Sequence, residues 1–291
     1  MFEGVFPAII TPFLKDESLD EEGLKKNIKY LSSTGISGIV PCGTTGESAT
    51  LTFEEHKRVV EIAVEASKVS VIAGTGSNNT REALELTRHA AEAGADAALL
   101  ITPYYNKPSE KGMFEHFKAI AEKCDIPIVL YNVPKRTGIN LNPDLVAKLS
   151  KIKNIVAIKE ASADLSQQSK IIEQTRGSDF VVLSGDDDLT LPTMALGARG
   201  VVSVVANVAP KKTVAMVNAA LKGDFETARA IHYELLPLVR AMFLETNPIP
   251  VKTAHKYLGL ANGPLRLPMS SMAPDKEAIL KAIVERLGER A

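Results

Sequence analysis

The sequence predicts an α/β protein, a (β/α)₈ TIM barrel followed by a C-terminal helical extension. Eight short segments rich in Val and Ile alternate with amphipathic helical segments over about 220 residues, which is the strand number of a closed barrel. Near-continuous apolar strands are typical of a parallel sheet that is buried on both faces. Only helical patterns follow the eighth segment. We therefore expect a barrel domain at residues 1–222 and a helical extension at residues 223–291.

The individual elements follow from β-branched runs and from helix-capping residues. The expected strands are Gly4–Ile10, Gly38–Pro41, Ser70–Ala73, Ala97–Ile101, Pro127–Tyr131, Ile155–Lys159, Phe180–Leu183 and Gly200–Val204. Thr52 and Glu55 form a capping box that begins a helix through Ala66. Asn79 begins the next helix, and Gly94 ends it. The later expected helices are Glu110–Lys123, Asn142–Leu149, Leu165–Gln174, Pro210–Lys222, Asp224–Leu244, a helix from near Pro248 through Tyr257, and Pro274–Leu287.

Composition excludes several classes of function. Lys and Arg number 34 and Asp and Glu 35, so a net charge of -1 gives no reason to bind nucleic acid or an acidic membrane. No apolar stretch approaches ~18 residues, so we expect no membrane span. The start MFEG lacks the features of a signal peptide, and two cysteines, Cys42 and Cys124, cannot build a disulfide framework. The five histidines are scattered, and we expect no metal and a cytoplasmic location.

Working groups of a (β/α)₈ barrel lie at the carboxyl ends of its strands. Lys159 ends the sixth expected strand, so its amine should project into a partly dehydrated barrel mouth. Burial disfavours an ammonium, and a neutral amine can attack a carbonyl to form an imine. The alternative is a structural lysine that pairs with a carboxylate, Asp186 or Glu160.

Two other strand ends carry hydroxyl groups. Tyr131 can relay protons, although a core tyrosine bonded to a backbone carbonyl is an equal alternative. Thr44 and Thr45 lie in the glycine-flanked loop Gly43–Glu47, which can hold a carboxylate or can be an ordinary turn. Asp186–Asp188 offers acidic groups for magnesium, but acids also favour a helix start, which is the interpretation we prefer.

Glycine-rich phosphate-binding signals are incomplete. Gly74–Gly76 begins like a dinucleotide fingerprint but lacks the third glycine. The segment after the eighth strand, Ala206–Pro210, has no glycine-rich phosphate cradle. These features predict a substrate that is not phosphorylated.

Six motifs together are similar to one family. They are GTTGE at 43–47, ITPYYNKP at 101–108, YNVPKRTG at 131–138, IKEAS at 158–162, SGDD at 184–187 and ETNPIPVK at 245–252. With them the chain resembles, over essentially its whole length, the dihydrodipicolinate synthase family of pyruvate-dependent class I aldolases and lyases. The resemblance implies condensation of pyruvate with L-aspartate 4-semialdehyde through a lysine imine, in lysine and diaminopimelate biosynthesis. It also implies a homotetramer, built as a dimer of dimers, that needs no cofactor.

The same resemblance assigns roles by matching position. Lys159 is then the Schiff-base lysine, Tyr131 the proton donor and acceptor, and Thr44 a relay to Tyr105 of a neighbouring subunit. Substrate contacts fall to Thr45, Arg136, Gly185 and the backbone of Val202, with Arg136 anchoring the semialdehyde carboxylate. A lysine-binding allosteric site is matched by Ala49, His56, Asn78, Glu82 and Tyr104. Phe53 departs from the histidine of lysine-sensitive members, which predicts weak feedback inhibition.

Two other classes of function compete with this interpretation. Another pyruvate-dependent aldolase, of the N-acetylneuraminate lyase or 2-keto-3-deoxygluconate aldolase type, shares the lysine and tyrosine, but sugar substrates do not call for Arg136. A non-catalytic ligand-binding barrel would form no covalent adduct with pyruvate.

Overall fold

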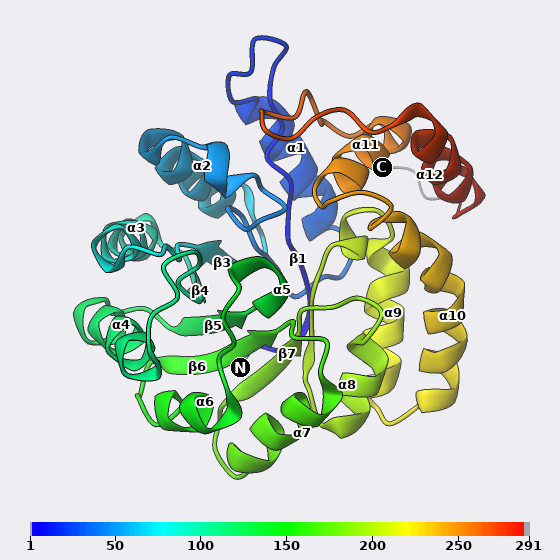
Figure 1. Ribbon diagram of the computed structural model, residues 1–291. Coiled ribbons are helices and arrows are strands. Elements are labelled where there is room, and N and C mark those ends of the chain that lie inside the picture. Colours follow the sequence, from blue (N-terminus) through cyan, green and yellow to red (C-terminus); the bar gives the residue numbers. More distant parts are fainter. Residues whose placement is uncertain (1, 288–291) are drawn as a thin grey trace. The chain divides into compact units, whose positions relative to one another are not determined.

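The computed structural model describes residues 2–287 and contains an eight-stranded parallel sheet (Figure 1). The strands are β1 (Gly4–Pro7), β2 (Gly38–Ile39), β3 (Ser70–Gly74), β4 (Ala97–Ile101), β5 (Ile128–Asn132), β6 (Ile155–Glu160), β7 (Val181–Ser184) and β8 (Gly200–Ser203). Their order is β1-β8-β7-β6-β5-β4-β3-β2. A parallel bridge between Ala8 and Val40 joins the two ends of this order, which confirms the predicted (β/α)₈ barrel.

The chain divides into two compact units that each contain part of the sheet. One unit comprises residues 2–4 and 72–202, and the other comprises residues 5–71 and 203–287. In the described part of residues 223–291, the structure has three helices and no strand. The predicted domain boundary at residue 222 stays a prediction, and residues 288–291 of the expected extension lie outside the described residues.

The unit that contains residues 72–202 carries β4 to β7 and six helices around them in the sequence (Figure 1). These helices are α3 (Thr80–Ala93), α4 (Glu110–Lys123), α5 (Pro134–Thr137), α6 (Pro143–Leu149), α7 (Leu165–Gln174) and α8 (Thr190–Leu196). Asn79 caps α3 and Gly94 ends it with φ 92°, as predicted. The preferred helix start at Asp186–Asp188 is wrong, because α8 begins at Thr190 and has no acidic residue in its first turn.

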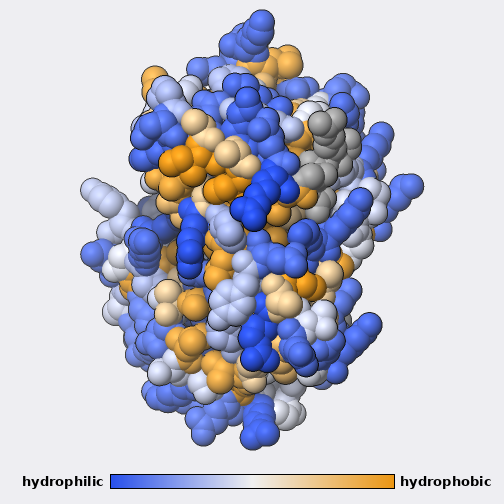
Figure 2. Space-filling view, turned by 90° about the vertical axis from the view of Figure 1, so that its right-hand side faces the viewer, coloured by the Kyte–Doolittle hydropathy of each residue, from blue (hydrophilic) through white to orange (hydrophobic). Residues whose placement is uncertain are grey.

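The other unit is mostly helical. Its elements besides strands are α1 (Glu21–Ser32), η1 (Ser48–Thr50), α2 (Phe53–Ala66), η2 (Val205–Asn207), α9 (Pro210–Leu221), α10 (Phe225–Ala241), α11 (Ile249–Leu258) and α12 (Pro274–Leu287). The capping box of Thr52 and Glu55 is formed at α2. Helix α1 was not expected, although Leu24, Ile28 and Leu31 repeat at helical spacing. On the face drawn in Figure 2, apolar side chains lie in groups among charged ones. No helix among residues 2–287 is long and apolar enough to cross a bilayer.

Several expected elements are longer than the observed ones. The first strand ends at Pro7 rather than Ile10, and the second ends at Ile39 rather than Pro41. Helix α10 ends at Ala241 rather than Leu244, because the following residues form turns. Apolar runs predict burial, and buried residues continue beyond the assigned strand ends, as at Ile9 and Ile10 after β1.

Candidate active site

Lys159 and Tyr131 lie side by side on adjacent strands. The two residues are register partners at the ends of β6 and β5. Each is 7% exposed, and the Lys159 Nζ atom lies 4.2 Å from the centroid of the Tyr131 ring. A primary amine and a phenol ring thus lie side by side at the carboxyl end of the sheet, and imine chemistry with proton transfer uses these two kinds of group.

The carboxyl groups near Lys159 do not pair with it. In the part of the chain that the structure describes, Lys159 forms no ion pair, so the alternative of a lysine clamped by Asp186 or Glu160 is not realised. Asp186 is close enough to interact electrostatically with Lys159, and its Oδ2 atom is buried without a hydrogen-bond partner among the described residues. Burial raises the pKa of Asp186 to about 6, and Asp188 adds to this effect.

Glu160 lies on the opposite face of β6 from Lys159, because side chains alternate along a strand. Its fully buried carboxylate accepts hydrogen bonds from Ser162 N at 2.7 Å, Asn132 Nδ2 at 3.0 Å and Gln167 Nε2 at 3.4 Å. Burial raises the pKa of Glu160, and these hydrogen bonds oppose the rise. Glu160 is therefore a structural anchor rather than a partner of the amine.

Asn132 connects this anchor to the segment that contains α5. Its Nδ2 atom donates to Asn140 Oδ1 at 2.8 Å, and its Oδ1 atom accepts from Leu141 N at 2.9 Å. Arg136 lies in α5, between Asn132 and Asn140 in the sequence, and is exposed. Sequence reasoning assigned no role to Asn132 and considered Glu160 only as an ion-pair partner of Lys159, although each directly follows a residue at a predicted strand end.

Gly185 and Val202 belong to the same unit as Lys159. Gly185 N donates to Glu160 O at 2.7 Å, and a Cβ atom at Gly185 would lie 2.6 Å from that of Ala161. The backbone after β7 therefore approaches Ala161 this closely only because no side chain is present at Gly185. Val202 lies in β8 and is 1% exposed.

The loop Gly43–Glu47 lies in the other unit and forms consecutive turns. Gly46 N and Glu47 N donate to Gly43 O and Thr44 O, both at 3.1 Å. Thr44 is half-buried, whereas Thr45 is 2% exposed and its hydroxyl accepts from Asn247 Nδ2 at 3.0 Å. The Glu47 carboxylate accepts from Lys252 Nζ at 2.5 Å and from Arg266 N at 3.1 Å. Sequence reasoning noted GTTGE and ETNPIPVK as motifs, but it did not predict the contacts between them.

The residues expected to meet a second subunit or a regulatory lysine are placed as follows. Tyr105 is 89% exposed with φ 71°, and neighbouring Tyr104 is 39% exposed. Asn78 Nδ2 donates to Tyr104 O at 3.2 Å, and Glu82 accepts from Ser77 Oγ at 2.8 Å. In the other unit, the remaining three residues of this prediction are exposed Ala49, buried His56 and Phe53 at the start of α2.

Metal ligands are not gathered anywhere in the described chain. Among residues 2–287, no group of three or more His, Cys, Asp or Glu side chains could hold an ion. Asp187 is 7% exposed, whereas Asp186 is half-buried and interacts electrostatically with Lys159.

The comparison with known proteins covers the whole chain. The profile of the dihydrodipicolinate synthetase family matches residues 1–287. A 4-hydroxy-tetrahydrodipicolinate synthase from Methanothrix thermoacetophila is 69% identical over 289 residues, which are 99% of this chain and 98% of the relative. The enzyme of that name from Methanosarcina mazei is 59% identical over 288 residues and 99% of each chain. A dihydrodipicolinate synthase structure from Aquifex aeolicus has a TM-score of 0.96 at 49% identity and covers 99% of this chain and 98% of that one. This chain belongs to the dihydrodipicolinate synthetase family.

Proposed function

We propose that this protein condenses pyruvate with L-aspartate 4-semialdehyde through an imine on Lys159. The product is 4-hydroxy-tetrahydrodipicolinate, a precursor in lysine and diaminopimelate biosynthesis. The observation that carries the proposal is the contact of the Lys159 amine with the Tyr131 ring, with no carboxylate paired to that amine in residues 2–287. The names and full-length coverage of the relatives from Methanothrix thermoacetophila and Methanosarcina mazei give independent support.

The proposed reaction balances without a metal or organic cofactor. The Lys159 Nζ atom adds to the pyruvate carbonyl carbon, and water leaves to give the imine. Loss of a methyl proton gives an enamine, with the electron pair taken up by the imine nitrogen. The enamine carbon then attacks the aldehyde carbon. Finally the amine of the adduct displaces Lys159 and closes the ring.

Each proton transfer in this sequence needs a group that can donate or accept a proton. The proposal gives Tyr131 the role of donor and acceptor, and Thr44 and Tyr105 continue the relay. Thr45 and the backbone of Val202 bind the pyruvate-derived part, and Gly185 leaves room beside it. Arg136 binds the semialdehyde carboxylate, since a guanidinium pairs with a carboxylate through two hydrogen bonds.

The test is borohydride reduction in the presence of pyruvate, followed by mass spectrometry of the Lys159 peptide. We expect a reduced pyruvate adduct on Lys159, none in Lys159→Ala, and turnover of pyruvate with aspartate semialdehyde. An unmodified Lys159 would support a non-catalytic barrel. Adduct formation with turnover of sugar acids instead of the semialdehyde would support an N-acetylneuraminate or 2-keto-3-deoxygluconate aldolase.

We further propose a cytoplasmic homotetramer, a dimer of dimers, in which Tyr105 completes the site of a neighbouring subunit. The 89% exposure of Tyr105 and its positive φ support this role, because backbone strain tends to persist where function needs it. The free, buried thiols of Cys42 and Cys124 fit a reducing compartment. Mixing inactive Lys159→Ala with inactive Tyr105→Phe should restore activity, since a mixed pair contains one intact site. A monomer by light scattering, or no restored activity, would contradict the assembly.

A further inference from the structure

Glu47 and Lys252 form a fully buried ion pair that the proposed reaction does not use. Their side chains are 2% and 1% exposed, and the Lys252 Nζ atom lies 2.5 Å from a Glu47 carboxylate oxygen. The two residues are 205 positions apart in the sequence. Removing two charges from water is costly, and an apolar pair of similar size often stabilises a fold as well or better. The pair therefore calls for an explanation other than stability.

The surroundings fix the pair tightly. The Phe13 ring contacts two cations, with Lys252 Nζ at 4.2 Å and the Arg266 guanidinium carbon at 4.0 Å from its centroid. Arg266 N donates to the second carboxylate oxygen of Glu47. Burial lowers the pKa of Lys252 to about 8, while Glu47 opposes this shift. Lys252 is thus held beside Glu47 although its charge is poorly solvated.

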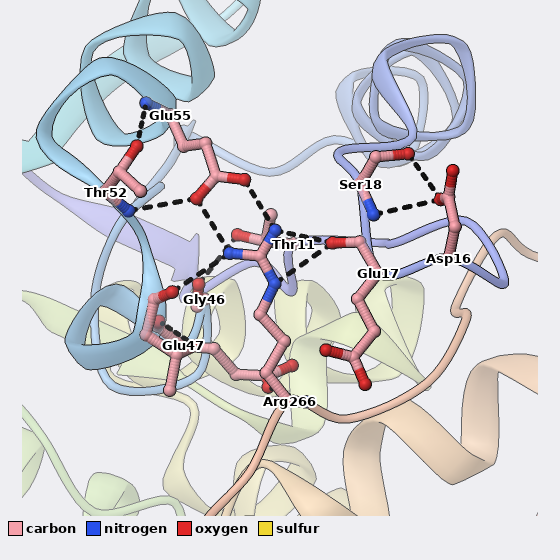
Figure 3. Close-up of polar contacts among 10 residues, drawn as sticks. Thr11, Asp16, Glu17, Ser18, Gly46, Glu47, Thr52, Glu55 and Arg266 are labelled. Atoms are coloured by element: carbon pink, nitrogen blue, oxygen red, sulfur yellow. Dashed lines mark hydrogen bonds and ion pairs between the residues drawn. The ribbon is translucent and has the colours of Figure 1, made fainter.

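The side chain of Arg266 extends this arrangement to the segment that follows the loop Gly43–Glu47 (Figure 3). Its guanidinium contacts Glu55 Oε2 at 2.7 Å and Thr50 O at 2.9 Å. The Thr11 hydroxyl donates to Gly46 O, within the loop itself, at 2.7 Å. The loop is therefore bounded on both sides by side chains from distant parts of the sequence.

Two residues near the start of α11 hold the loop at two points. Asn247 donates to the Thr45 hydroxyl, and Lys252 donates to the Glu47 carboxylate. Glu47 has φ 54°, a left-handed conformation that is unfavourable for a residue with a side chain. Such strain persists only where surrounding contacts over-determine the conformation. The ion pair supplies that constraint at the end of the loop that carries Thr44 and Thr45.

We propose that Glu47 and Lys252 are positioning residues, whose buried pair holds the loop Gly43–Glu47 in the conformation that presents the Thr44 and Thr45 hydroxyls to the substrate. This role rests on the proposed function, because it matters only if those hydroxyls act in the condensation. It differs from a structural role in what it predicts. Loss of the pair should lower kcat in protein that is still folded. The KM for pyruvate should rise with it, because Thr45 binds the pyruvate-derived part, while the KM for aspartate semialdehyde changes little.

The test compares Lys252→Met, Glu47→Gln and the double variant with Leu280→Ala. Leu280 is a buried residue of α12 in the same unit, and it lies outside the loop and its contacts, so its truncation controls for lost stability. We expect Lys252→Met to lose about 100-fold in kcat, as for a misplaced catalytic group. The double variant has no unpaired buried charge and should fold, yet it should be no more active than the worse single variant, because the two residues act as one unit.

Hydrogen exchange gives a readout that does not depend on activity. The amides of Gly46 and Glu47 should exchange faster in Lys252→Met and in the double variant, and they should be unchanged in Leu280→Ala. A folded double variant with wild-type kcat, wild-type exchange in the loop, or an equal loss of kcat in Leu280→Ala would each overturn the positioning role. A wild-type protein that forms neither adduct nor product would instead refute the proposed function, and the positioning role with it.

Discussion

Asn132 provides a quantitative test of how the Arg136 segment is held. Asn132→Ala removes one hydrogen bond to the buried Glu160 carboxylate and two neutral ones, with Leu141 N and Asn140 Oδ1. A hydrogen bond to a charged group contributes about 2 kcal/mol and a neutral one about 1 kcal/mol or less, so the expected loss of unfolding free energy is about 3 kcal/mol. The segment that carries Arg136 should also lose the side-chain hydrogen bonds that join Asn140 and Leu141 to β5.

We therefore expect Asn132→Ala to raise the KM for aspartate semialdehyde about tenfold, equivalent to about 1.4 kcal/mol of binding. The KM for pyruvate and the borohydride adduct on Lys159 should be retained. Urea denaturation measures the loss of stability. Steady-state kinetics with each substrate varied in turn measures the two KM values, and mass spectrometry after borohydride measures the adduct. Asn154→Ala is a matched control, because the Asn154 amide donates to three backbone carbonyls in the same unit, those of Ala121, Cys124 and Ile126. The reasoning is refuted if both variants lose similar stability and both keep a wild-type KM for the semialdehyde.

Three further predictions concern recognition, pH and regulation. Arg136→Ala should lower kcat/KM for the semialdehyde about 30-fold while leaving the pyruvate adduct intact, and Arg136→Lys should recover only part of the loss; equal effects on both substrates would argue against a carboxylate anchor. Burial lowers the pKa of His255 from 6.5 to about 4, so the unfolded chain binds a proton that the folded one does not. The stability present above pH 6.5 should fall by about 3 kcal/mol as the pH drops to 4, and His255→Gln should flatten this slope in urea titrations at several pH values. Lysine should inhibit weakly, and Phe53→His should tighten inhibition about tenfold if one added hydrogen bond is what is missing; micromolar inhibition of the wild type would contradict the prediction.

The part of the site that could be predicted lies where local pattern and sheet geometry agree. Lys159 and Tyr131 each end a continuous β-branched run, and parallel strands place such ends at one edge of the sheet. Their register partnership and the 4.2 Å contact agree with that rule. The barrel itself was predictable for the same reason, since each strand and most helices carry a local signal.

The parts of the site and fold that could not be predicted depend on contacts between residues that no local sequence pattern indicates. The Glu47–Lys252 pair joins residues 205 positions apart, and it requires a left-handed backbone at Glu47. The start of α8 was misplaced because Asp186 is held in a turn by Ser184, whose hydroxyl donates to Asp186 O, and not in a helix. Side-chain bonds to the backbone compete with helix formation at such positions, and their outcome depends on the fold around them.

The end of β6 shows how chemistry and fold are linked in this chain. The run Ile155–Ile158 is apolar on both faces, so it carries little information about which residues should face which side of the sheet. Lys159 and Glu160 supply that information, because a slip by one residue would exchange an amine that contacts the Tyr131 ring with a carboxylate that needs the donors of Asn132 and Ser162. A misplaced carboxylate or amine would then be buried without its partners, at a cost of several kcal/mol. Lys159, on which we propose that the imine forms, and Glu160 next to it thus specify the strand register on which the proposed site depends.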